Sequence, residues 1–247
     1  MLPVGLRVLS GGVVQFDRGK SISISAANMD SYNCTRFVRT GALNKPPLVL
    51  LNALAELEAE HEVEGSKVPL HIAEMLDRYP RMRSEYSYQG ASNDVLYQSG
   101  YSHHEDGDGN DPAFSCRSCD SAQRVTRLQR ASADPVIHYG IIASSNQVIK
   151  DSALRDRIGA EHGAICLEME AAGLMDSFPC IVIRGICDYA DSHKNKRWQR
   201  YAAATAAAYA KELLHKVPTS ELIPAPLQCR YFDQVSQAGL ETSGLFD

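Results

Sequence analysis

The chain has 247 residues, of which 44% are hydrophobic and 22% charged, and its formal net charge is −5. This composition is that of a globular protein and excludes gross disorder, collagen and coiled coil. No run of residues approaches the roughly 20 apolar positions of a membrane-spanning helix. The negative charge gives no electrostatic footprint for nucleic acid or an anionic membrane. We therefore expect one large or two small domains, with neither nucleic acid nor membrane as a partner.

Seven cysteines are scattered along the chain, an odd number without the spacing of a disulfide framework. Arg7 interrupts the apolar N-terminal stretch, which also lacks the small-residue cleavage site of a secretory signal. Together these features predict a cytoplasmic protein in a reducing compartment.

The first third of the chain opens with one predicted strand. Residues 11–17 have the apolar pattern of a short strand, and Gly19 with Lys20 is typical of the turn that ends it. Residues 21–35 are polar and irregular, which indicates a surface loop.

Two helices are expected next. Residues 48–62 form an apolar helical stretch, and Asn44 is the expected N-cap because its side chain can accept a backbone hydrogen bond. The two prolines before this stretch suit a first helical turn, where a missing N–H costs little. Residues 68–79 predict a second, shorter amphipathic helix.

Periodicity fades over residues 82–134, where Gly, Ser, Asp and Asn cluster. Irregular segments of this length are uncommon inside a compact domain and are usually functional. We expect an insertion at about residues 82–134 that leaves the fold and returns to it.

After residue 134 strands and helices alternate. The expected strands are 135–143, 164–167 and 180–187, and the expected helices are 151–162, 170–176 and 198–215. This alternation indicates an α/β fold with a largely parallel sheet. Residues 219–247 are expected to be a C-terminal tail or linker after a single domain of residues 1–218.

Polar residues follow each of these three strands. They are residues 144–147, 168–170 and 187–191. Ligands of open α/β sheets bind beyond the carboxyl ends of the strands, so three polar strand ends that meet are a stronger signal than any single motif.

Arg184 stands in an otherwise apolar strand, where a lone charge costs too much to lack a partner. Glu168 or Glu170 is the expected partner, and a bound anion is the other candidate. Because Glu170 begins a predicted helix, the two glutamates should diverge, so that one faces a ligand while the other ties down the sheet. The alternatives are a purely structural ion pair at Arg184 and two acids that only charge a helix N-terminus.

Three of these segments carry a family resemblance. Residues 143–147, 167–172 and 183–188 are similar to the purine/uridine phosphorylase and nucleosidase superfamily. Over residues 11–218 the chain resembles the nucleoside-phosphorylase-like domains of fungal NLR-type proteins, where such a domain precedes NACHT, ankyrin or TPR modules. The resemblance implies a three-layer α/β fold with a mostly parallel or mixed sheet flanked by helices.

The resemblance also implies an activity. The family cleaves the N-glycosidic bond of a nucleoside, with phosphate or water as co-substrate and no organic cofactor. Asp188 matches the family aspartate that donates a proton or a strong hydrogen bond toward N7 of a purine. A neutral purine leaves more readily than an anion, so an acid at this position lowers the barrier.

Other positions match the binding half of the family's site. Glu170 matches the glutamate that holds the ribose hydroxyls, and Met169 the residue that packs on the sugar. Val148 and Ile149 match the wall of the base pocket. The complete set expected to bind substrate is Glu170, Met169, Glu168, Arg184, Val148, Ile149 and Asn146.

The resemblance leaves the nucleophile unassigned. In the family, the first part of the domain supplies a Gly-rich, Arg-containing phosphate site or a glutamate that activates water, and we expect that part to be missing before Gly11. The alternatives to a pentosyltransferase or nucleosidase are therefore a purine-sensing or signalling module without turnover and a partial gene product. Relatives often build the site across a subunit interface, which leaves a homo-oligomer open.

Two weaker motifs lie in the predicted insertion. Cys116 and Cys119 form a CxxC motif with His103 and His104 upstream, a set that fits structural zinc, two free thiols or a redox pair. A single CxxC without a second cysteine pair favours no metal. Three arginines suit either nucleotide phosphates or, more simply, a solvated basic face; they are Arg124, Arg127 and Arg130.

Overall fold

The structure is a computed structural model that describes residues 6–17, 19–24, 34–39, 43–104, 116, 118–128 and 130–218. The expected tail at residues 219–247 lies outside these ranges. Among the described helices, none is long and apolar enough to cross a membrane.

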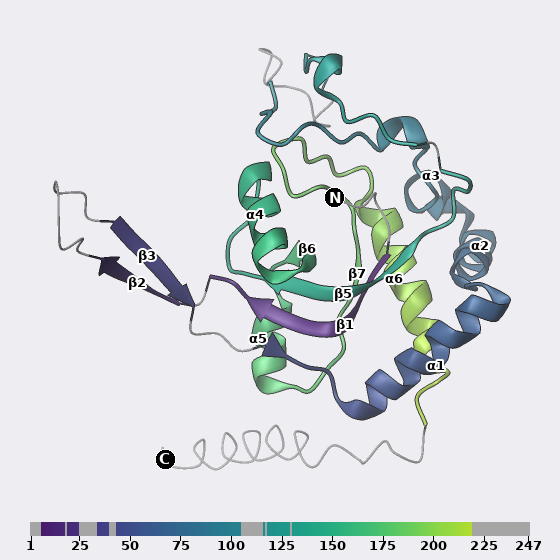
Figure 1. The fold of residues 1–247 in the computed structure, drawn as a ribbon. Helices are drawn as coiled ribbons and strands as arrows, with labels where there is room; N and C mark the ends of the chain where they lie inside the picture. Colours follow the sequence, from purple (N-terminus) through teal and green to yellow (C-terminus); the bar gives the residue numbers. More distant parts are fainter. Residues whose placement is uncertain are drawn as a thin grey trace, which may run out of the picture.

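A mixed sheet forms the centre of the chain (Figure 1). Strands β1 (Leu6–Gln15), β5 (Ile137–Ser144) and β6 (Ala164–Glu168) are parallel neighbours. Strands β4 (Leu43–Asn44) and β7 (Ile183–Gly185) both pair with β1 in the antiparallel direction. The predicted α/β class with a mostly parallel or mixed sheet is confirmed, and the sheet is of the mixed kind.

The first strand begins earlier than the sequence pattern predicts. Its pairing with β5 shifts register between Leu9 and Val13, and Gly12 has a φ of 119°. The two glycines therefore mark a bulge inside the strand, where a positive φ favours glycine. The predicted strand start at Gly11 is therefore wrong, because the two glycines lie inside β1 and not at its beginning.

The predicted surface loop at residues 21–35 is wrong at both ends. Strands β2 (Gly19–Ile24) and β3 (Cys34–Arg39) form an antiparallel two-stranded sheet that projects from the rest of the chain (Figure 1). Serine alternates with isoleucine along the second half of β2, which is the period of a strand. Only two apolar residues show this alternation, so the polar composition of the segment indicated a loop and not a strand.

The helices of the first third are confirmed, with one change at a cap. Helix α1 (Leu48–Glu64) begins after Pro47, while Asn44 lies in β4 and donates a side-chain hydrogen bond to Asp176. Asn44 is therefore not the N-cap. Helix α2 (Val68–Arg78) follows after a short turn.

The three predicted C-terminal helices are present. Helix α4 (Ser152–His162) starts at Asp151, whose carboxylate accepts two backbone N–H bonds, and it ends at Gly163 in the left-handed conformation. Helices α5 (Ala171–Ser177) and α6 (Gln199–Leu214) lie within a residue or two of their predicted ranges.

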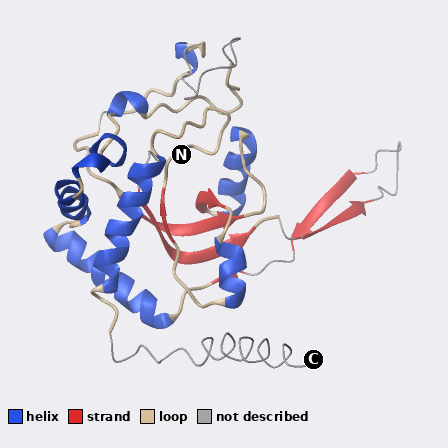
Figure 2. Ribbon diagram, turned by 180° about the vertical axis from the view of Figure 1, so that it is seen from behind, coloured by secondary structure: helices blue, strands red, loops and turns tan. Residues whose placement is uncertain are grey.

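Helices cover both sides of the central sheet, as Figure 2 shows from behind. Alternate residues of β1 point to different helices, because successive strand side chains face opposite ways. Val13 packs with Ile142 and α5, whereas Val14 packs with Ile158 of α4. The largest apolar cluster joins α1, α2 and α6 around the fully buried Tyr209.

The segment of residues 82–134 has only short helices where it is described: a one-turn α3 (Arg83–Tyr86) and three-residue 3₁₀ turns. It is nevertheless docked on the fold. Leu96 and Tyr97 are buried, and the indole N–H of Trp198 donates to the carbonyl of Asn93. The predicted irregular insertion is thus packed against the rest of the domain.

The contact between β7 and α6 makes a stability prediction. A Cβ on Gly185 would lie 1.9 Å from the carbonyl oxygen of Ala202, in the backbone of α6. Gly185→Ala must push the strand and helix apart, so we expect a loss of about 3 kcal/mol or more in the free energy of unfolding. Urea unfolding followed by circular dichroism measures this loss.

Gly173→Ala is the matched control, because a Cβ at Gly173 in α5 meets nothing within 4 Å. This change should be neutral or stabilise the protein by up to about 1 kcal/mol, as alanine is the better helix former. Equal unfolding midpoints for the two variants would contradict the tight packing of β7 on α6.

Candidate functional site

A pocket of about 290 Å³ is lined by the segment after β5, by β6 and the turn that follows it, and by β7 with the loop that follows it. Polar residues from all three predicted segments line it, so the convergence expected from the sequence occurs. Lining residues that carry polar or charged groups are Ser145, Gln147, Glu168, Glu170, Arg184, Cys187, Asp188, Tyr189, Lys194 and Gln199.

The strand ends meet for two different physical reasons. Strands β5 and β6 are parallel and in register, with Ser144 opposite Glu168, so their carboxyl ends lie side by side. Strand β7 is antiparallel to β1 and does not share this edge through sheet pairing. The segment that follows β7, residues 186–190, brings its side chains to the pocket as a loop.

Glu168 holds the start of helix α5. Its side chain is 6% exposed, and Oε2 accepts the backbone N–H groups of Glu170 at 2.9 Å and Ala171 at 2.7 Å. A carboxylate at a helix N-terminus satisfies donors that have no partner within the helix. Of the roles considered for the two glutamates, Glu168 therefore has the structural one, although it also lines the pocket.

The side chain of Glu170 points away from the start of α5 and forms an ion pair with Arg184. The distance from Arg184 Nη1 to Glu170 Oε2 is 3.0 Å, and the two side chains are 40% and 59% exposed. The predicted partner is thus present. The expectation that Arg184 is cut off from solvent is wrong. Strand β7 is short, and the side chain of Arg184 reaches the open pocket.

Asp188 accepts hydrogen bonds on both carboxylate oxygens. Oδ1 lies 3.0 Å from Lys194 Nζ and 2.8 Å from the backbone nitrogen of Ala190. Burial, together with the nearby Asp188 charge, raises the pKa of the Cys187 thiol to about 11. At neutral pH this sulfur keeps its proton and donates it to Asp188 Oδ2, 3.6 Å away.

The loop that carries Asp188 is anchored from two sides. Arg155 of α4, which is buried, donates to the carbonyl of Tyr189 at 2.9 Å. The Tyr189 hydroxyl donates to Asp94 and accepts from Arg127, both in the insertion. Ala190 is held at a φ of 51°, a strained value for a residue with a Cβ.

The remaining predicted residues divide into two groups. Met169, Val148 and Ile149 line the pocket as expected. Asn146 does not line it, and its backbone N–H donates to Asp17 Oδ2 at the end of β1 instead. The fixed turn after β5 directs this position away from the site.

Of the three arginines of the insertion, Arg127 is half-buried and paired, whereas Arg124 is exposed. Arg127 is bound to Tyr189 and Asp94, Arg130 donates to the carbonyl of Asp134, and Arg124 pairs through its backbone with Tyr97.

Sequence reasoning did not identify Lys194 or Gln199 as pocket residues. A signal for Lys194 exists, since it is the first cation after Asp188 in the same loop. Gln199 had none, because only the packing of α6 beside β7 brings it to the pocket.

The role of Glu168 in holding α5 is testable through stability. Glu168→Ala removes two charge-assisted hydrogen bonds, and we expect it to lower the free energy of unfolding by about 3 kcal/mol. Glu168→Gln keeps one acceptor oxygen and should cost about 1 kcal/mol. Chemical denaturation measures both, and Glu62→Ala, an exposed position on α1, should change it by less than about 0.5 kcal/mol. An unchanged stability in Glu168→Ala would contradict the structural role.

Comparisons with known proteins found several similar sequences. No protein-family model matches the chain. A nucleotide-binding leucine-rich repeat (NLR)-like protein of Hyaloscypha variabilis is 41% identical over 215 residues, which is 87% of this chain and 19% of that protein. The chain therefore spans about a fifth of the length of this relative.

Shorter matches lead to nucleosidases. The ATP nucleosidase Cap17 of Escherichia coli is 33% identical over 89 residues, or 34% of this chain and 18% of that protein. A 5'-methylthioadenosine/S-adenosylhomocysteine nucleosidase of Mycobacterium bovis is 33% identical over 89 residues, covering 34% of this chain and 35% of that enzyme.

Among solved structures, a futalosine hydrolase mutant of Helicobacter pylori aligns with 87% of this chain and 63% of that one, with 16% identity and a TM-score of 0.44. The relatives found by sequence are an NLR-like protein and two nucleosidases. These relatives are consistent with the nucleoside phosphorylase/nucleosidase superfamily that the sequence motifs resemble.

Proposed function

We propose that the pocket binds a purine nucleoside or nucleotide and cleaves its N-glycosidic bond. The observation that carries this proposal is the presence in one pocket of Asp188 from the loop after β7 with Glu170 and Met169 from the loop after β6. These are the residues that the family resemblance assigns to the base and to the sugar. The named activities of the nucleosidase relatives support the same reaction class.

Asp188 acts at the base. Departure of the purine requires a proton or a strong hydrogen bond at N7, since the neutral base is the better leaving group. The Asp188–Lys194 pair holds a proton beside this position, with 3.0 Å between Nζ and Oδ1. In the proposed reaction Lys194 donates this proton through the carboxylate to the leaving base, and the proton lost by the water that attacks C1′ restores Lys194. Cys187 and the Ala190 N–H keep the carboxylate oriented.

Glu170 acts at the sugar. An exposed carboxylate at the pocket wall accepts hydrogen bonds from two ribose hydroxyls, and its negative charge stabilises the positive charge that develops on the ring. Arg184 holds Glu170 from the side at 3.0 Å and restricts its rotamers. Met169 supplies an apolar surface beside it.

The charge of the pocket favours water as the attacking group. Among the described lining residues there are three acids and two cations. Arg184 and Lys194 each form an ion pair with one of those acids. A phosphate dianion would have to displace one of these pairs, whereas water would not.

A second candidate is a domain that binds a purine ligand as a sensor without turning it over. It is favoured by the 41% identity to an NLR-like protein more than five times the length of the matched segment. In that case the Glu170 and Asp188 contacts would serve affinity alone. We also propose a cytoplasmic location, on the cysteine usage described above.

Base release separates these functions. The purified chain is incubated with adenosine, inosine, guanosine and ATP, with and without phosphate, and free base is measured by chromatography. We expect release without phosphate, reduced at least about 100-fold by Asp188→Asn and by Glu170→Gln, because each variant loses a group that acts in the transition state.

Asp77→Asn, on the exposed face of α2, is the matched control and should leave release unchanged. Calorimetric binding of a nucleoside without any base release would support the sensor and contradict the enzyme. Release that persists in Asp188→Asn would contradict the assigned acid.

A further inference from the structure

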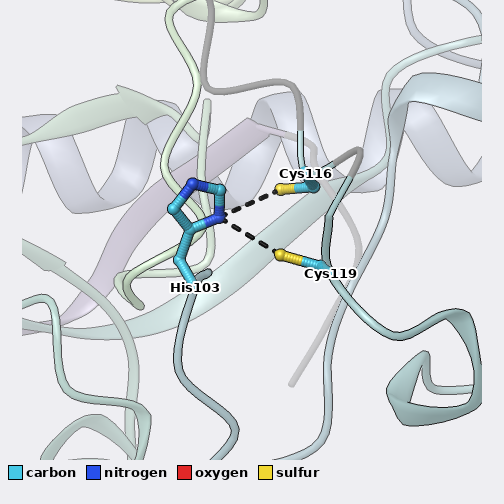
Figure 3. A group of neighbouring side chains, drawn as sticks. All are labelled: His103, Cys116 and Cys119. Carbon is cyan, nitrogen blue, oxygen red and sulfur yellow. Dashed lines mark hydrogen bonds between the residues drawn. The ribbon is translucent and has the colours of Figure 1, made fainter. Parts of the chain in front are cut away.

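Three metal-ligating side chains converge in the insertion, outside the pocket (Figure 3). His103 Nδ1 lies 3.6 Å from Cys116 Sγ and 3.3 Å from Cys119 Sγ, and the three atoms are all within 4.8 Å of one another. Zinc binds sulfur at about 2.3 Å and nitrogen at about 2.0–2.1 Å, so the nitrogen and sulfur ligands of a tetrahedral zinc lie roughly 3.6 Å apart. The observed spacing matches that value.

We propose that His103, Cys116 and Cys119 bind one zinc-type divalent metal ion. The ligand set is chemically suited to it, since thiolate and imidazole together select zinc over calcium or magnesium. Binding displaces a proton from each thiol, and the metal takes the place of both protons between the sulfurs and the imidazole nitrogen.

Hydrogen bonding by itself accounts poorly for this arrangement. Both sulfurs approach the same nitrogen, Nδ1 of His103 (Figure 3). An unprotonated imidazole nitrogen has one lone pair and accepts one hydrogen bond well. A cation at the centre of the three atoms satisfies all of them at once.

The backbone of the CxxC turn is shaped to present both sulfurs. Cys116 has a φ of 46°, which is strained for a residue with a Cβ. The Cys119 N–H donates to the Cys116 carbonyl at 3.3 Å and closes the turn. Cys119 is buried and Cys116 half-buried, so the sulfurs are shielded from solvent.

The site joins the insertion to the loop that carries Asp188. The backbone N–H of His103 donates to Ser192 Oγ at 2.9 Å, and its ring lies edge-on to His193, with 5.5 Å between centroids. His193 is buried and stacks on Tyr97 at 4.0 Å, and neither of its ring nitrogens has a hydrogen-bond partner among the described residues. A metal at His103 therefore ties Cys116 and Cys119 to residues 192–193, and this role does not depend on the proposed function.

The sequence pattern by itself favoured no metal, because one CxxC lacks a second cysteine pair. The structure supplies what spacing did not show, namely that His103 folds back onto both sulfurs from 13 and 16 residues upstream. His104, the other candidate ligand, is exposed and does not belong to the group.

Metal analysis of the full chain tests the proposal. The chain is purified under reducing conditions, and zinc is measured by elemental analysis, with one ion per chain expected. After removal of metal by a chelator with reductant present, cobalt(II) is added as the probe. We expect the ligand-field bands of a tetrahedral site and a thiolate-to-cobalt charge-transfer band whose intensity corresponds to two sulfurs.

The variants Cys116→Ser, Cys119→Ser and His103→Ala should each weaken zinc binding by more than about 100-fold, because each removes a direct ligand. Cys180→Ser is the control, as Cys180 is a half-buried cysteine outside the group, and it should bind zinc like the unaltered chain. Removing the metal from the unaltered chain should also lower its thermal midpoint, a measurement that does not depend on how the variants fold.

Two results would overturn the proposal. One is a reduced, folded chain that binds neither zinc nor cobalt with thiolate character. The other is a native chain two hydrogens lighter by mass spectrometry with Cys116 and Cys119 joined in one peptide, which would show a disulfide in place of the metal.

Discussion

The pairing of β5 with β6 is the constraint from which the rest of the pocket follows. Its register sets Ser144 opposite Glu168, and both side chains then hold the amino end of α5. Ser144 Oγ accepts the N–H of Ala172, while Glu168 Oε2 accepts those of Glu170 and Ala171. With the first turn of α5 held by two neighbouring strands, Glu170 is directed out of the sheet and toward Arg184.

The other half of the pocket depends on long-range anchoring rather than on the sheet. The loop from Asp188 to Lys194 contains a strained alanine, and it is held by buried Arg155 on one side. On the other side Asp94 and Arg127 of the insertion bind the Tyr189 hydroxyl. Burial raises the pKa of Tyr189, so its hydroxyl stays protonated at neutral pH and remains a donor to Asp94. An insertion without long elements thus positions the loop with the acid assigned to the base.

Much of the fold was predictable because its signals are local. Helix α4 illustrates this, since Asp151 and Gly163 cap it through residues adjacent in sequence. The wrong predictions occurred where one residue pattern is compatible with two local structures. Two glycines inside β1 resembled a strand start, although pairing on both sides makes them a bulge. Asn44 resembled a cap, although pairing with Val13 makes it part of a strand.

The sequence by itself indicated the α/β class, a family resemblance and most of the polar residues that line the pocket, because these follow from periodicity and from contiguous motifs. Only the tertiary structure decided how those residues divide their roles: Glu168 holds a helix, Glu170 pairs with Arg184, and Lys194 pairs with Asp188. It also decided that His103 meets both cysteines of the CxxC motif. The physical reason is the same throughout, since side-chain direction and partner distance depend on strand register and on contacts between segments far apart in the chain. The net charge of −5 gave no electrostatic indication of a nucleic-acid partner, and the structure adds that each of the two cations in the pocket lining forms an ion pair with one of its acids.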